Sequence, residues 1–259
     1  MTPLSASAAA VVGTVGPPPL VPLLGGGGTS LIWFIGFVLL AVLSGYLGYV
    51  GYRLYRTAPG SQRTLWAYFG FVGTAGVVTG GIGAFRTTLV EPPVAFAALV
   101  PTLLVGYVFA CGLTLREAQY NAVFSDREID RLGEYPTRRG IEVGIVLGIV
   151  GMGVPPLFFD GLAPAVLSVV LAPAVIVYGT YFYREHLRGA ASQGTLVDTL
   201  MRHMLVTLVF YALAGVVTAL LLVVPDAGAL DSLGATVLTI GGGSQIAVVV
   251  KFGQHTASV

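Results

Sequence analysis

Charged side chains are scarce in this chain of 259 residues. Only 10% of its residues are Asp, Glu, Lys or Arg, against roughly a quarter in a typical soluble domain, and the mean hydropathy is +0.86. The formal net charge is +1, so the chain lacks the positive field on which nucleic-acid binding depends. This composition excludes a water-soluble enzyme, a nucleic-acid binder and a disordered tail. It indicates a protein embedded in the lipid bilayer.

Cysteine is almost missing as well. Cys111 is the single cysteine, so the chain cannot form an internal disulfide. Its Cys and His residues do not have the spacing of a metal site. We also find no nucleophile with an adjacent base, no phosphate-binding loop and no nucleotide-binding fingerprint. We therefore expect no enzymatic activity and no metal centre.

Long apolar runs are what the chain has in abundance. A membrane-spanning helix needs about 20 mostly apolar residues, and seven segments meet this requirement. They cover approximately 31–52, 65–85, 94–115, 140–159, 162–183, 204–224 and 232–252. The sequence thus predicts an all-α bundle of seven transmembrane helices, forming one domain over 30–259. A flexible outer leader, rich in Pro and Gly, is expected over 1–29.

The basic residues lie almost entirely on one side of the predicted bundle. Of the 13 Lys and Arg residues, only Arg86 falls on the other side. Lys and Arg mark the cytoplasmic ends of membrane spans, so we expect a multi-pass protein of the cell membrane with its N-terminus outside and its C-terminus in the cytoplasm. The longest predicted loop, 116–139, is cytoplasmic. Its alternating charges suit a solvated amphipathic helix, which could dock a cytoplasmic partner.

Glycines recur at helical spacing in several spans. Small residues let helices approach closely in lipid, where no hydrophobic force drives their association. The stripes consist of Gly45, Gly48 and Gly51; of Gly73, Gly76, Gly80 and Gly83; and of Gly140, Gly144 and Gly148. Each stripe predicts close packing of helices within the chain. The third stripe could instead join two copies of the chain in a homo-oligomer.

Carboxylates are missing from the centre of every predicted span. All 12 acidic residues fall in loops or near a span end. Ionisable groups in the middle of a bilayer are costly and usually functional, so this distribution argues against proton transport through carboxylates.

Uncharged polar residues do occur inside the predicted bundle. The best candidate for a polar site is Ser244 and Gln245, next to Gly241–Gly243, with Thr207 and Tyr211 on the preceding span. The alternative is that these groups only form interhelical hydrogen bonds that stabilise packing. Arg86 and Glu91 are close in sequence at the outer mouth of the bundle and are placed to pair.

Five short segments form a recognisable pattern along the predicted spans: Leu31-Ile32-Trp33-Phe34, Tyr52-Arg53, Leu99-Val100-Pro101-Thr102-Leu103-Leu104, Arg202-His203 and Phe210-Tyr211. This pattern resembles the microbial rhodopsins, a family of seven-helix membrane proteins that bind retinal. The resemblance implies a helix 7 lysine that binds retinal and carboxylates on helices 3 and 7. In the matching register the helix 3 positions fall on Ala95 and Gly106. The helix 7 lysine position falls on Ile246.

These departures lead to the expected function. The pump carboxylates that the resemblance implies are absent, so we expect a non-enzymatic, opsin-like membrane protein without a cofactor, acting as a receptor, transducer or assembly partner. The alternative is a photoreceptor or ion transporter with retinal bound to Lys251, the single lysine of the chain. A lysine at that position also suits a positively charged anchor at the cytoplasmic end of the last helix.

The second predicted span ends in a glycine-rich stretch followed by Arg, Gly80-Gly81-Ile82-Gly83-Ala84-Phe85-Arg86, and Pro92-Pro93-Val94 comes next. This stretch resembles the trimeric cation channels of seven-helix topology, whose second helix carries a glycine-rich stretch followed by Arg. That family repeats the motif in helix 5, whereas 166–183 contains no such string. A cation channel is therefore a further alternative.

Overall fold

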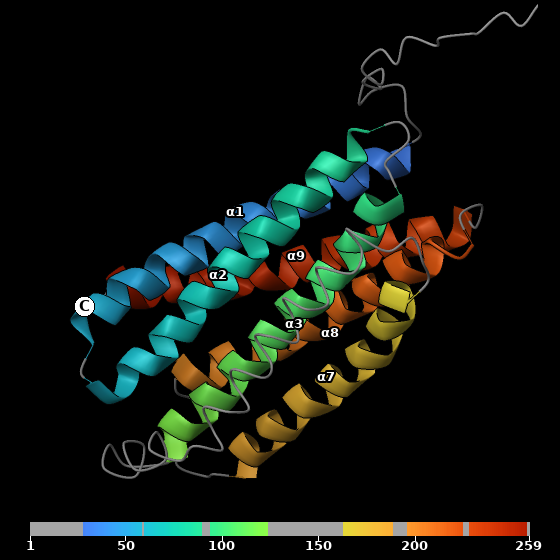
Figure 1. The fold of residues 1–259 in the computed structure, drawn as a ribbon. Helices are drawn as coiled ribbons and strands as arrows, with labels where there is room; N and C mark the ends of the chain where they lie inside the picture. Colours follow the sequence, from blue (N-terminus) through green and yellow to red (C-terminus); the bar gives the residue numbers. More distant parts are fainter. Residues whose placement is uncertain are drawn as a thin grey trace, which may run out of the picture.

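The computed structural model describes residues 28–58, 60–89, 94–123, 163–188, 196–224 and 228–257. Within these ranges the regular structure consists of six α-helices and contains no strand (Figure 1). The helices are α1 (Gly28–Thr57), α2 (Gly60–Thr87), α3 (Val94–Val123), α7 (Ala163–Arg188), α8 (Leu196–Leu221) and α9 (Gly228–Ala257).

Five of these helices are long and apolar enough to cross a membrane: α1, α2, α3, α8 and α9. Large apolar side chains such as Val42, Val77 and Phe85 are exposed on the outside of the bundle, where a lipid-embedded protein needs them. These findings confirm the predicted all-helical membrane protein. The number of seven spans and the orientation of the termini stay predictions.

The fourth predicted span, 140–159, lies outside the described residues, together with Gly140, Gly144 and Gly148. The fifth predicted span, 162–183, corresponds to α7. Helices α3 and α7 run in the same direction along the bundle (Figure 1). The described chain therefore stops at one end of the bundle after α3 and resumes at the opposite end with α7.

The third helix is longer than its apolar run. It continues to Val123, so residues 116–123 of the predicted loop 116–139 are helical. Their sequence is rich in good helix formers, including Leu, Arg, Glu, Ala and Gln. The side chains of Arg116 and Glu117 are also buried, at 5% and 0% exposure. The apolar run ends before Arg116, but helix propensity and the burial of side chains extend the helix to Val123.

α3 is the central helix of the described bundle and the most buried of the five candidate spans. It packs against α2, α7 and α8, while α9 packs against α1 and α8. The described helices thus enclose a continuous core. Its largest fully buried side chains include Phe37, Phe69, Tyr107, Tyr211 and Phe252.

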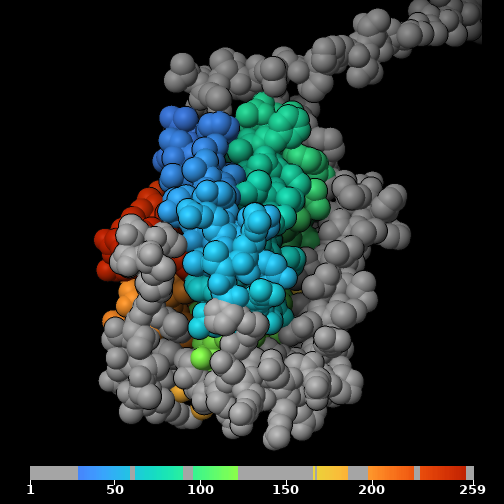
Figure 2. Space-filling model, turned by 90° about the vertical axis from the view of Figure 1, so that its left-hand side faces the viewer, coloured from blue at the N-terminus to red at the C-terminus, as the bar shows by residue number. Residues whose placement is uncertain are grey.

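α1 and α2 form the closest helix pair, and Figure 2 shows them side by side on one face of the molecule. Glycines make this close approach possible. A Cβ atom added to Gly73 would overlap the Cα atom of Gly48, and one added to Gly80 would meet the carbonyl oxygen of Phe37 and the backbone of Ala41. We call this contact the glycine seam. It accounts for the glycine stripes of the first two predicted spans.

The glycine seam predicts that Gly73→Ala destabilises the protein. The added methyl group meets backbone of α1, which cannot rotate away, and overpacking of this kind typically costs about 1–3 kcal/mol. Gly81→Ala is the matched control because no atom lies within 4 Å of the added Cβ. Unfolding in SDS, followed by circular dichroism, measures both variants. Equal stability of the two would contradict the seam.

Candidate functional site

Side-chain hydrogen bonds connect α1, α8 and α9 near the middle of these helices. The Tyr211 hydroxyl donates to Gln245 Oε1 at 2.9 Å, and Gln245 Nε2 donates to Ser44 Oγ at 2.8 Å. A further bond of 2.9 Å joins the hydroxyls of Thr207 and Ser244. We call these five residues the polar centre. The structure thus brings together the four residues that the sequence singled out, and it adds Ser44.

Helical spacing explains how α8 and α9 meet at the polar centre. Thr207 and Tyr211 are four residues apart, so both lie on the same face of α8. Gly241 comes close to the Tyr211 ring, since an added Cβ would lie 3.2 Å from Tyr211 Cε1. Gly241 of α9 therefore leaves space for this aromatic ring beside Ser244 and Gln245.

α2 and α3 close the polar centre on the other side. A Cβ added to Gly76 would overlap the Ser44 hydroxyl, and it would lie 2.9 Å from Cε2 of Tyr107. The Tyr107 ring packs edge-on against the Tyr211 ring, with centroids 5.3 Å apart. Cys111 lies one turn further along α3 and is also buried. All five candidate spans therefore contribute to the surroundings of the polar centre.

The sequence did not point to Ser44 or Tyr107. Ser44 stands next to Gly45 and four residues before Gly48, where a hydroxyl looks like one more small packing residue. Tyr107 stands among apolar residues of α3 and resembles an ordinary core aromatic. The usable signal is the spacing of Ser44 and Gly48, which places the hydroxyl on the face that meets α2.

A separate cavity of about 240 Å³ lies where α2 ends and where α1 and α9 begin. We call it the end cavity. Its lining consists of Thr29, Ser30, Trp33, Phe37, Arg86, Thr87, Leu89, Leu221 and Asp231. Trp33 Nε1 donates a hydrogen bond of 2.8 Å to Asp231 Oδ1. Glu91, the predicted partner of Arg86, lies outside the described residues, and Asp231 is the acidic residue that shares the cavity with Arg86.

Charged side chains are also buried at the opposite end of the bundle. Arg116 Nη2 donates to the Tyr68 hydroxyl at 3.3 Å, and Arg202 forms an ion pair of 3.7 Å with Asp198 on α8. Glu117 accepts a hydrogen bond of 3.5 Å from Asn121. We expected acidic residues only in loops or near span ends. The structure adds that Glu117 and Asp198 are buried near helix ends rather than solvated.

Lys251, Gly80 and Gly83, three of the residues on which the two family resemblances depend, lie outside the polar centre and the end cavity. Lys251 is exposed near the end of α9, whereas the next residue, Phe252, is buried in the core. Retinal attached to Lys251 would therefore start from the outside of the bundle. Gly80 and Gly83 pack against α1 in the glycine seam, so they are occupied by helix packing.

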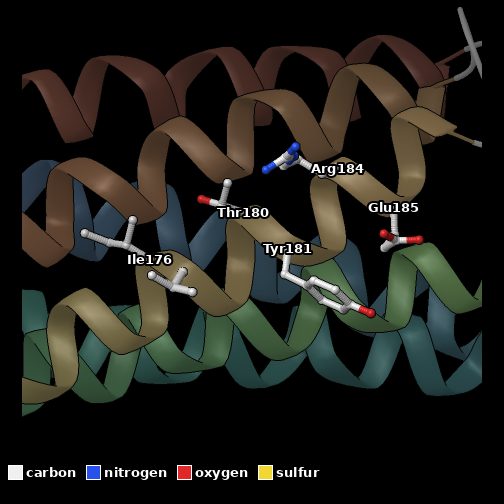
Figure 3. A pocket seen from close by; sticks show the side chains of 6 residues that line it. Ile176, Thr180, Tyr181, Arg184 and Glu185 are labelled. Carbon is white, nitrogen blue, oxygen red and sulfur yellow. The ribbon is translucent and has the colours of Figure 1, made fainter.

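α7 carries a groove of about 360 Å³ near its end (Figure 3). The described residues that line it all belong to this one helix and include Thr180, Tyr181, Arg184 and Glu185. In the described parts of the chain, no group of three or more His, Cys, Asp or Glu side chains is placed to hold a metal ion. Among the described residues, the polar centre and the end cavity each bring together polar side chains from three helices.

No protein-family model matches the chain, and no curated protein or solved structure matches it. The function must therefore be argued from the bundle and its polar groups.

The polar centre predicts energetic coupling between Tyr211 and Gln245. Tyr211→Phe and Gln245→Leu should each lower the free energy of unfolding, and the double variant should lose less than the sum. The coupling should be about 0.6 kcal/mol, the usual value for such bonds between membrane helices. Thr236→Val is a control because its hydroxyl bonds only to Ser232 O in its own helix. Strictly additive losses would show that the Tyr211–Gln245 bond does not contribute.

Proposed function

We propose that the chain is a non-enzymatic, opsin-like membrane protein of seven helices that acts as a receptor or signal transducer. The polar centre is the observation that carries this proposal. It links α1, α8 and α9 through the buried side chains of Ser44, Thr207, Tyr211 and Gln245 and the half-buried side chain of Ser244. Packed helices joined by such a network have a small number of discrete arrangements, and a transducer needs at least two of them.

The energetics of the polar centre suit a change of arrangement. Hydrogen bonds between membrane helices are worth about 0.6 kcal/mol on average. The hydroxyls of Ser44 and Ser244 and the amide of Gln245 can each donate or accept, so one partner can replace another without leaving a polar group unsatisfied. A shift of α9 against α1 and α8 would therefore cost little. Complete separation of α9 from α1 and α8 would cost much more, because it breaks the hydrogen bonds of the polar centre and the packing of α9 against both helices.

The surroundings of Lys251 and of the second glycine stripe favour this proposal over its rivals. A retinal pigment needs an enclosed chromophore, and Lys251 is exposed. A cation channel that uses the motif Gly80–Arg86 needs these glycines to line its ion pathway. Gly80 and Gly83 instead pack against α1. An assembly partner stays compatible with the polar centre, but it does not require a second arrangement of the helices.

Cys111 provides a native reporter of such a second arrangement. It is the single cysteine, 1% exposed, beside Tyr107 near the polar centre. If the bundle opens locally, N-ethylmaleimide should label Cys111 in the folded protein. Tyr211→Phe should raise the labelling rate about threefold, which corresponds to the loss of a bond of about 0.6 kcal/mol. Mass spectrometry of the purified protein follows the reaction.

Two comparisons decide whether this labelling reports a local opening. Tyr49→Phe is the matched control, because Tyr49 is 58% exposed on α1, and it should leave the rate unchanged. A local opening exposes little surface, so the wild-type rate should barely change at SDS concentrations below the unfolding transition. A rate that rises in proportion to the unfolded fraction would mean that the bundle is rigid, and the transducer proposal would fail.

The rival functions have direct tests of their own. We expect all-trans retinal to give no visible absorption band that depends on Lys251, and liposomes containing the protein to show no cation flux that depends on Arg86. A band that disappears in Lys251→Ala would identify a pigment. A flux that disappears in Arg86→Ala would identify a channel. Either result would replace the receptor proposal.

A further inference from the structure

We infer that the end cavity binds a small zwitterionic solute, with Arg86 holding its anionic group and Asp231 its cationic group. The cavity measures about 240 Å³, which is below the range of roughly 300–1,000 Å³ for pockets of drug-sized ligands. A compound of the size of an amino acid fits this volume. This inference goes beyond the proposed function and does not depend on it, since a solute can bind without any change in the bundle.

The two charges face the same cavity and attract each other, but they do not form a direct contact. Arg86 is in the last turn of α2, and Asp231 is in the first turn of α9. Both residues are described, and no hydrogen bond or ion pair within 4.0 Å joins them. A group can therefore lie between them.

The helix ends explain why each charge is stable at its own position. The C-terminal end of a helix favours a cation, and the N-terminal end favours an anion. Arg86 and Asp231 each occupy the favourable end. The structure can thus keep both charges at the cavity without bringing them into contact.

The electrostatics of the cavity select a ligand that carries both charges. Asp231 repels a simple anion that approaches Arg86, and Arg86 repels a simple cation that approaches Asp231. A zwitterion is attracted at both points. The apolar lining formed by Leu89, Leu221 and Phe37 accommodates an aliphatic portion, while the hydroxyl of Thr29 provides a further polar contact.

Trp33 fixes the orientation of Asp231. Its indole donates to Oδ1 of the carboxylate, which leaves Oδ2 for a ligand. The Trp33 ring is held in turn by Phe37, with ring centroids 5.7 Å apart, and by the close approach of Gly234 on α9. A carboxylate held in this way loses little conformational freedom when the ligand binds.

Trp33 also makes the inference testable. The chain has 2 tryptophans, so Trp66→Phe leaves Trp33 as the single tryptophan fluorophore, inside the cavity. We would titrate this full-length variant in dodecyl maltoside with alanine, leucine and phosphoethanolamine. Propionate and ethylamine serve as probes with one charge only. A zwitterion should change the Trp33 emission saturably, and the single-charge probes should need at least about tenfold higher concentrations.

Substitutions then locate the response at the two charges. Arg86→Gln and Asp231→Asn, introduced into the same Trp66→Phe background, should each weaken zwitterion binding about tenfold to hundredfold. Asp231→Asn keeps the acceptor for Trp33, so it removes the charge alone. Arg53→Gln, at an exposed arginine of α1, is the control and should bind as the parent does.

The outcomes separate the sources of the zwitterion and decide the inference. A response to alanine or leucine supports a free amino acid, and a response to phosphoethanolamine alone supports a lipid headgroup. The inference is overturned if no zwitterion changes the emission, or if propionate or ethylamine binds as tightly as the zwitterions. It is equally overturned if both charge variants bind as the parent does.

Discussion

The close approach of α1 to α2 is the contact on which the rest of the described bundle depends. Gly48 and Gly73 let the two backbones touch, and Gly76 leaves the space that the Ser44 hydroxyl occupies. Ser44 can then accept the hydrogen bond from Gln245 of α9. A side chain on α2 at this point would displace α1, and the buried amide of Gln245 would lose an acceptor. Because α2 has a glycine at this point, Ser44 of α1 and Gln245 of α9 can form their hydrogen bond.

This dependence follows from the solvent. In lipid, apolar side chains gain nothing by leaving the solvent for the protein interior, so helices associate through tight packing and polar contacts. The glycine seam supplies the first contribution, and the polar centre supplies the second. The edge-on contact of Tyr107 with Tyr211 joins the two, since Tyr107 packs against both Gly76 and Tyr211. The core thus depends on a few specific contacts rather than on apolar area.

The sequence predicts the features that depend on local pattern. Apolar runs locate the helices, and the spacing of Gly73, Gly76 and Gly80 identifies the face that meets α1. Polar residues such as Gln245 stand out in an apolar run and indicate the polar centre. Contacts between segments that are far apart in the chain could not be predicted from the sequence. The sequence predicted a pairing of Arg86 with Glu91, which lies outside the described residues, and gave no indication that Asp231 shares a cavity with Arg86. Only the fold reveals that the end of α2 lies beside the start of α9.

The length of α3 has a mechanical consequence. Its 30 residues make a rod of about 45 Å, while the hydrocarbon layer of a bilayer is about 30 Å thick. The helix is therefore longer than the layer is thick, and Arg116 and Glu117 lie toward its C-terminal end. α3 is stiff and packs against α2, α7 and α8, so it can act as a lever. A small tilt at its middle, beside Tyr107, becomes a larger sideways displacement at its tip.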